Sequence, residues 1–176
     1  MSPIADGIGL PQLLAGLVAL QRLGELAHAR RNARALLAEG GVEHGAGHYP
    51  LLVGLHAAWL LAVALLVPAE APESWPLVGV FAALQGLRLW TIRSLGRFWT
   101  TRVITLPAAP LVRRGPYRVL RHPNYCIVAA EIAVLPLAFG AWEIAVVATL
   151  ANGLLLAHRI GVEARALAGR SPGPAD

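Results

Sequence analysis

Five apolar stretches are the feature that most constrains the fold of this chain. They cover about residues 8–26, 51–67, 75–92, 125–139 and 141–158. Only 14% of the 176 residues are charged, whereas a soluble domain carries about 25%. Lipid must therefore cover part of the surface, and a backbone that crosses lipid must be helical to satisfy its hydrogen bonds. We predict an all-α integral membrane protein with about five transmembrane helices, forming a single domain over residues 1–176.

The arginines predict how these helices cross the membrane. All fifteen basic side chains are arginine, and clusters of them follow the first, third and fifth apolar stretches. The connection 68–74 contains none. Basic loops stay in the cytoplasm, so we expect the N-terminus outside and the C-terminus in the cytoplasm. The last two stretches are separated by Gly140 alone, which predicts a C-terminal helical hairpin.

The long connection 93–124 is predicted to be a folded cytoplasmic cap. It contains four prolines, which exclude a long helix, and it is too apolar and aromatic to be a solvated linker. We expect it to lie against the membrane face. The last residues, 169–176, are rich in glycine and proline and are predicted to be a disordered tail.

Several functional classes are excluded by the sequence. Nucleic-acid binding requires a basic face on a water-soluble fold, so no nucleic-acid partner is expected. Glu43, His44 and His48 do not have metal-site spacing, because glycines break any helix that would align them. Cys126 is the only cysteine, which excludes a thiolate cage. No metal is expected, and no phosphate-binding loop is present.

The densest polar segment runs from Arg113 to Tyr125, at the start of the fourth apolar stretch. Asn124 is the expected N-cap of that helix, whose free N–H groups suit a carboxylate or another anion. Arg159 and Glu163, at the end of the fifth stretch, are four residues apart and share a helical face. A hairpin would bring these two residues back to the mouth of the fourth helix.

Among the ionisable residues within the apolar stretches, two are candidates for function. Glu131 is about six residues into the fourth stretch, where a carboxylate is costly unless it is paired or neutral. It is either a functional residue or a structural partner of Arg88 or Asn152. Arg88 lies near the cytoplasmic end of the third stretch, where it could snorkel or bind an anionic group together with Arg97.

Three motifs gather at the mouth of the predicted hairpin: Gly115–Arg118, Arg121–Tyr125, and Arg159–Ile160 followed by Glu163. In these motifs the chain resembles the isoprenylcysteine carboxyl methyltransferase family of membrane enzymes. It is most similar to the small bacterial branch that accompanies type III polyketide synthases and O-methylates alkylpyrones or alkylresorcinols. That similarity extends to residues 22–26, 30–32, 47–50 and 94–102. The chain departs from the family pattern at Ile127, often glycine, and at Ala164, where the family has a second glutamate.

The resemblance implies an enzyme of the bacterial cytoplasmic membrane. It would transfer a methyl group from S-adenosylmethionine to an enol, phenol or carboxylate oxygen of an alkylpyrone, alkylresorcinol or isoprenylcysteine. A type III polyketide synthase is a possible functional partner. The alternatives are a non-enzymatic membrane protein, such as a transporter subunit or assembly factor, and a sterol-reductase-like nicotinamide enzyme.

The resemblance also implies roles for individual residues. The cofactor is expected to contact the following residues: Gly115, Tyr117, His122, Pro123, Asn124, Tyr125, Arg159 and Glu163. The lipophilic acceptor is expected to enter from the bilayer toward Arg88, Trp99 and Glu131. Glu131 would act as a base for a phenol, and Arg88 or Arg97 would steady the anion of a more acidic acceptor.

Overall fold

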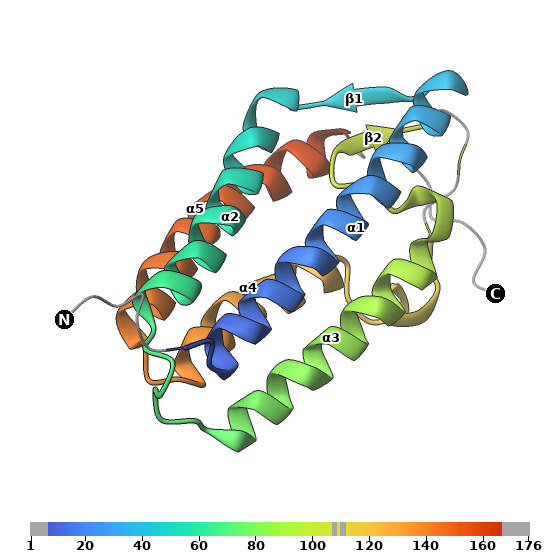
Figure 1. The fold of residues 1–176 in the computed structure, drawn as a ribbon. Coiled ribbons are helices and arrows are strands. Elements are labelled where there is room, and N and C mark those ends of the chain that lie inside the picture. The colour runs from blue at the N-terminus through green and yellow to red at the C-terminus, as the bar shows by residue number, and fades with distance from the viewer. Residues whose placement is uncertain (1–6, 107–108, 110–111, 167–176) are drawn as a thin grey trace.

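The computed structural model describes residues 7–106, 109 and 112–166. These residues form a mostly helical bundle (Figure 1). Its helices are α1 (Leu10–Ala38), α2 (Tyr49–Leu66), α3 (Trp75–Leu95), α4 (Pro123–Leu137) and α5 (Trp142–Ala166). The tail 169–176, predicted to be disordered, lies outside the described residues, as do residues 107–108 and 110–111 of the predicted cap.

Two helices extend beyond the apolar stretches that predict them. α1 has 29 residues and continues past the predicted end near residue 26. α5 has 25 residues and continues past residue 158. Both extensions are rich in alanine and arginine, which are good helix formers. Hydropathy therefore located only the apolar part of each helix. The continuation of α5 agrees with the prediction that Arg159 and Glu163 share a helical face, whereas the continuation of α1 was not predicted.

Three of the described helices are long and apolar enough to cross a membrane: α2, α5, and α3 with the turn that follows it. α4 is apolar but has only 15 residues, or about 22 Å of helix against a hydrocarbon core of about 30 Å. α1 is long but more polar, and its first half exposes Leu13, Leu17, Leu20 and Leu23. The chain is built as a membrane protein, and the predicted number of five spans stays a prediction.

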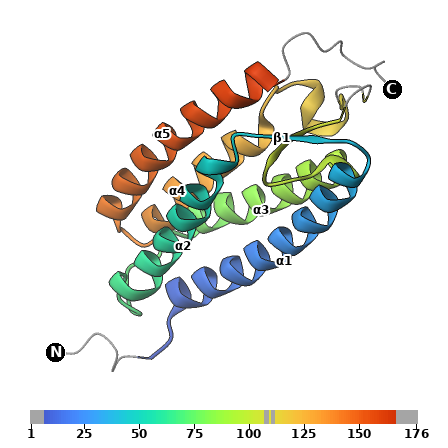
Figure 2. The ribbon, with the colours of Figure 1, turned by 90° about the horizontal axis from the view of Figure 1, so that it is seen from above.

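Successive helices alternate in direction (Figure 1). One end of the bundle joins the start of α1 to the α2–α3 connection and the α4–α5 turn. There the Gln12 side chain donates a hydrogen bond to the Val67 carbonyl at 2.7 Å, and the Ser74 N–H donates one to the Ala138 carbonyl at 2.8 Å. The opposite end, called the arginine-rich end below, holds the segments that follow α1 and α3 and the last turns of α5. Figure 2 shows α5 and α1 at opposite edges of the bundle.

The arginine-rich end contains a feature that the all-α prediction missed. Strands β1 (Val42–His44) and β2 (Val103–Thr105) pair as an antiparallel ribbon, with Glu43 opposite Ile104. β2 is a run of β-branched residues, which favour extended backbone. At three residues it is too short to show a strand period, and its partner lies about 60 residues away in the sequence. The prediction of an all-α fold is therefore wrong at this point.

Three short 3-10 turns complete this end: η1 (Ala46–His48), η2 (Gly96–Phe98) and η3 (Gly115–Arg118). The ribbon and these turns connect the ends of several helices, so this end of the bundle is built from more of the chain than the predicted cap, residues 93–124. The main apolar core lies nearer the other end, around Trp59, Val63, Phe81, Ile132 and Leu135.

Candidate active site

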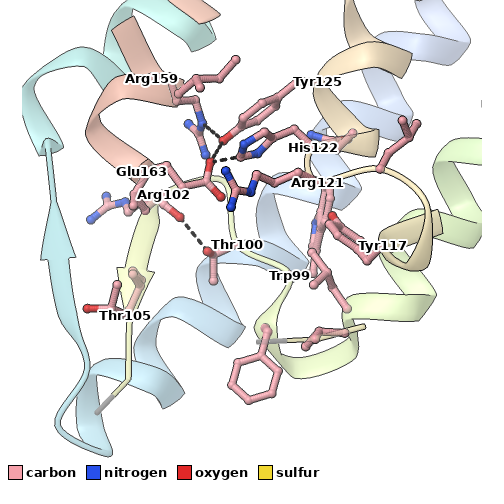
Figure 3. Close-up of a pocket in the computed structure, with 18 of the residues that line it drawn as sticks. Trp99, Thr100, Arg102, Thr105, Tyr117, Arg121, His122, Tyr125, Arg159 and Glu163 are labelled. Atoms are coloured by element: carbon pink, nitrogen blue, oxygen red, sulfur yellow. Dashed lines mark hydrogen bonds and ion pairs between the residues drawn. The ribbon is translucent and has the colours of Figure 1, made fainter. Parts of the chain in front are cut away.

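A cavity of about 790 Å³ lies at the arginine-rich end of the bundle. Its walls come from η2, β2, η3, the start of α4 and the end of α5. One side of the cavity carries the polar residues His122, Tyr125, Arg159 and Glu163 (Figure 3). Another side is apolar and includes Leu36, Leu95, Phe98, Trp99 and Val103.

The polar side is organised around the hydroxyl of Tyr125. This hydroxyl donates a hydrogen bond to Glu163 Oε2 at 2.5 Å and accepts one from Arg159 Nε at 2.7 Å. The Arg159 Nη1 also donates to the Thr101 carbonyl at 2.8 Å, which ties α5 to the segment before β2. His122 Nδ1 lies 3.7 Å from Glu163 Oε2. We call these four residues (His122, Tyr125, Arg159 and Glu163) the Tyr125 cluster.

The hairpin of α4 and α5 brings this cluster together, as the sequence predicted. α4 begins at Pro123, the first helical position, where a proline loses no helical hydrogen bond. His122 precedes it in a non-helical conformation, and its ring stacks on Tyr125 with the centroids 5.2 Å apart. The prediction of Asn124 as the N-cap is wrong, because Asn124 is already inside the helix. Its Oδ1 is buried and has no protein partner among the described residues.

Tyr117 and Gly115 lie in η3. Tyr117 lines the cavity, whereas Gly115, which was also expected to contact the cofactor, is not part of the lining. Burial raises the pKa of the Tyr117 phenol above its ordinary value, and the charges of Glu163 and Tyr125 add to this rise. Tyr117 therefore stays protonated and can donate a hydrogen bond. Gly115 has a φ of +53°, and a Cβ there would lie 2.2 Å from the Ser94 Oγ. Gly115 thus allows η3 to pack closely on α3.

Glu131 is engaged in a buried ion-pair network. It is 1% exposed, and its Oε2 accepts hydrogen bonds from Arg22 Nη2 at 2.6 Å and Arg88 Nη1 at 3.3 Å. Its Oε1 accepts one from the Gln85 amide at 2.9 Å. Glu25 pairs with Arg88 at 2.6 Å and with Arg22 at 2.9 Å. We call these four charged residues (Arg22, Glu25, Arg88 and Glu131) the buried network; their formal charges cancel.

The buried network identifies the partners of Glu131. Of the two that the sequence left open, Arg88 makes the contact. Asn152 is buried, and its side chain has no hydrogen-bond partner in the part of the chain that the structure describes. Sequence reasoning missed Arg22, which is 109 residues from Glu131. The only signal was a charged pair, Arg22 and Glu25, on the apolar part of α1.

The residues expected to meet the acceptor do not all reach the cavity. Trp99 lines it and is 3% exposed. The Arg88 guanidinium lies 6.0 Å from the centre of the Trp99 ring, so Arg88 supports this wall rather than forming it. Arg97 is exposed and pairs with Glu39 on the surface, apart from the buried network.

The lining of the cavity is positively charged. Its arginines are Arg102, Arg113, Arg118, Arg121 and Arg159, and Glu163 is its only acidic residue among the described ones. Arg102 is held by Glu43 of β1 at 3.0 Å and lies over the Tyr49 ring. Sequence reasoning did not assign Arg102 or Leu36 to the site, because the ribbon and the long α1 that carry them there were not predicted. Such a cavity suits a ligand with a carboxylate and apolar parts.

Two of the residues rejected as metal ligands, Glu43 and His44, have other partners. Glu43 pairs with Arg102, and a ring nitrogen of His44 lies 2.9 Å from the Thr105 hydroxyl across the ribbon. Within residues 7–106, 109 and 112–166, no group of three His, Cys, Asp or Glu side chains could hold a metal ion.

Comparison with known proteins gives one family and two relatives. A model of the isoprenylcysteine carboxyl methyltransferase family matches residues 77–169. The uncharacterized protein YpbQ of Bacillus subtilis strain 168 is 35% identical over 159 residues, which are 88% of this chain and 95% of that protein. An uncharacterized protein of Haemophilus influenzae is 26% identical over 151 residues, which are 83% of this chain and 88% of that protein. No solved structure matches this chain significantly.

Proposed function

Because this chain belongs to the isoprenylcysteine carboxyl methyltransferase family, a family of membrane methyltransferases, we propose that it methylates an oxygen of a lipophilic acceptor with S-adenosylmethionine. The observation that carries this proposal is the cavity itself. It combines the Tyr125 cluster with an apolar wall at one end of a membrane bundle. A charged cofactor and an apolar acceptor would both find matching surfaces there.

The residues of the polar side fit the groups of S-adenosylmethionine. Its ammonium would be met by Glu163 and by the buried Asn124 Oδ1, which has no partner among the described protein groups. Its carboxylate would be met by Arg159. Tyr117, which stays protonated, would donate to a ribose or adenine acceptor. When bound, the cofactor supplies an electrophilic methyl group on its sulfonium.

The apolar side fits a tail such as that of an alkylpyrone or alkylresorcinol. Leu36, Phe98, Trp99 and Val103 form this wall. At the lip of the cavity Val119 is 86% exposed and Leu120 47% exposed, an arrangement that costs free energy in water and favours contact with lipid. We propose that the acceptor enters from the bilayer past this lip. A type III polyketide synthase is the class of enzyme that would supply such an acceptor.

The protein's task in the transfer is alignment and exclusion of water, since the displacement at the methyl carbon is in line. An enol or a carboxylic acid ionises without a strong base. Glu131 already accepts hydrogen bonds from two guanidiniums, which favours such acidic acceptors over a phenol. Arg88 and Arg97 do not line the cavity, so we assign the steadying of the acceptor anion to Arg121, which does.

Binding of S-adenosylhomocysteine to detergent-purified protein tests this function. We expect saturable binding in the micromolar range, and transfer of labelled methyl from S-adenosylmethionine to an alkylpyrone in proteoliposomes. Protein that is folded but binds no S-adenosylhomocysteine would contradict the proposal. Binding without transfer to alkylpyrones, alkylresorcinols or isoprenylcysteines would contradict the acceptor class alone.

A further inference from the structure

We propose that α1 positions the apolar wall of the cavity, with Asn32 and the Glu25–Arg88 ion pair holding Trp99 where the acceptor's tail packs. This inference rests on the proposed function. The match to the methyltransferase family begins at residue 77, so α1 lies outside it. The family match alone therefore assigns no role to α1.

Asn32 holds the backbone around Trp99. Its side-chain amide donates hydrogen bonds to the Gly96 carbonyl at 3.1 Å and to the Trp99 carbonyl at 2.9 Å. These two carbonyls belong to the first residue of η2 and to the residue that follows it, so they hold the turn that carries the chain from α3 to the cavity wall. The same amide nitrogen also lies 3.3 Å from His28 Nε2 on α1. One side chain of α1 thus contacts this turn at two backbone positions.

The Glu25–Arg88 pair contacts the ring of Trp99 without lining the cavity itself. Arg88 Nε donates to Glu25 Oε1 at 2.8 Å, and Arg88 Nη2 donates to Glu25 Oε2 at 2.6 Å. A two-point contact of this kind fixes the plane of the guanidinium. The same guanidinium lies 6.0 Å from the centre of the Trp99 ring, within the range of a cation–π contact. α1 thus acts on the ring through Arg88 of α3.

α1 also supplies part of the wall itself. Leu36 is 2% exposed and lines the cavity together with Trp99. From Glu25 to Leu36, one helix therefore contributes an ion-pair partner, a backbone clamp and a lining side chain. These residues lie on the apolar side of the cavity, whereas the Tyr125 cluster is built by α4 and α5. A change in α1 should therefore affect the acceptor and not the cofactor.

Asn32→Ala is the sharpest test, because Asn32 lies outside the buried core and its loss should leave the bundle folded. We expect the dissociation constant of 5-pentadecylresorcinol, used as the probe, to rise about three- to tenfold, as for the loss of one or two hydrogen bonds. S-adenosylhomocysteine affinity should stay within a factor of about two. Arg31→Gln is the matched control: the neighbouring residue is exposed, and its replacement should change neither constant.

A second readout does not need a ligand. The emission of Trp99, obtained by subtracting the spectrum of Trp99→Phe in each background, should shift to longer wavelength in Asn32→Ala and be quenched more by acrylamide. Unchanged Trp99 emission would overturn the inference, as would equal losses of resorcinol and S-adenosylhomocysteine affinity. If wild-type protein binds neither compound, the proposed function fails, and the emission of Trp99 alone decides whether α1 positions this residue.

Discussion

At the scale of single residues, Tyr125 has the most specific arrangement in the site. Its hydroxyl donates a hydrogen bond to Glu163 and accepts one from Arg159. Removing this one oxygen leaves a carboxylate and a guanidinium without their common partner. The orientation of both charges toward a cofactor therefore depends on one phenol.

Tyr125→Phe is expected to weaken S-adenosylhomocysteine binding by roughly 1–3 kcal/mol, about five- to 150-fold, because the charged partners lose a hydrogen bond each. The thermal midpoint in detergent should change little, since Tyr125 lies at the mouth of α4 and not in the main core. Calorimetric titration measures the first effect and a thermal scan the second. Cys126→Ser, an exposed neighbour, is the control. Unchanged affinity in Tyr125→Phe would remove the Tyr125 cluster from the cofactor site.

The main expected effect of Glu131→Gln is a loss of folding stability. It would leave Arg22 and Arg88 sharing Glu25 as their only carboxylate in the buried network, and breaking a buried pair costs about 3–5 kcal/mol. The measurement is the thermal midpoint of purified protein. Glu39→Gln breaks the exposed pair with Arg97 and should cost less than about 1 kcal/mol. A stable Glu131→Gln protein that binds S-adenosylhomocysteine normally but turns over slowly would restore the role of base that the sequence predicted.

The sequence anticipated part of this residue-scale picture. It predicted that His122, Tyr125, Arg159 and Glu163 would meet, because their motifs lie at the two open ends of one hairpin. It did not predict that Arg22 would reach Glu131. That contact joins α1 to α4 across the bundle, and no local pattern carries information on how two distant helices pack.

At the scale of elements, η3 and the start of α4 form the most constrained segment. η3 packs on α3 through Gly115, whose positive φ and lack of a Cβ allow the close approach to Ser94. Tyr117, two residues later, enters the cavity lining from this turn. The position of one glycine therefore fixes one wall of the site.

Gly115→Ala is expected to destabilise the protein by about 1–3 kcal/mol, since the left-handed conformation strains any other residue. The new Cβ would also displace the Ser94 side chain, so S-adenosylhomocysteine affinity should fall as well. Gly79→Ala is the matched control, because Gly79 is helical, exposed and has no atom near its virtual Cβ. It should be neutral or slightly stabilising. Equal thermal midpoints for both variants would contradict the proposed packing of η3.

The elements themselves were only partly predictable. Helices α2 and α3 follow from continuous apolar stretches, and the α4–α5 hairpin follows from the single glycine between two of them. The ribbon of β1 and β2 did not follow, because three-residue strands show no period and the two are separated by α2 and α3. Because the ribbon was not predicted, the position of Arg102 in the cavity lining could not be expected. The hydrogen bond from Arg159 to the Thr101 carbonyl could not be expected for the same reason.

At the scale of the whole molecule, the two ends of the bundle carry opposite charge. Arginines lie toward the ends of α1 and α5 and in the segment after α3, at the end of the bundle that holds the cavity. The opposite end carries Glu70, Glu73 and Glu143. Basic loops remain on the cytoplasmic side, and a soluble cofactor is made there. Both considerations support our proposal that the cavity faces the cytoplasm.

Cysteine labelling in intact cells tests this orientation in a Cys126→Ser background. Glu73→Cys, in the exposed α2–α3 connection, should react with a membrane-impermeant maleimide from outside. Arg113→Cys, at the lip of the cavity, should react only after the cells are permeabilised. Glu70→Cys, also exposed in the same connection, should behave as Glu73→Cys does, which controls for local reactivity. The opposite pattern would place the cavity outside the cell, where S-adenosylmethionine is not supplied, and the proposed function would fail with the topology.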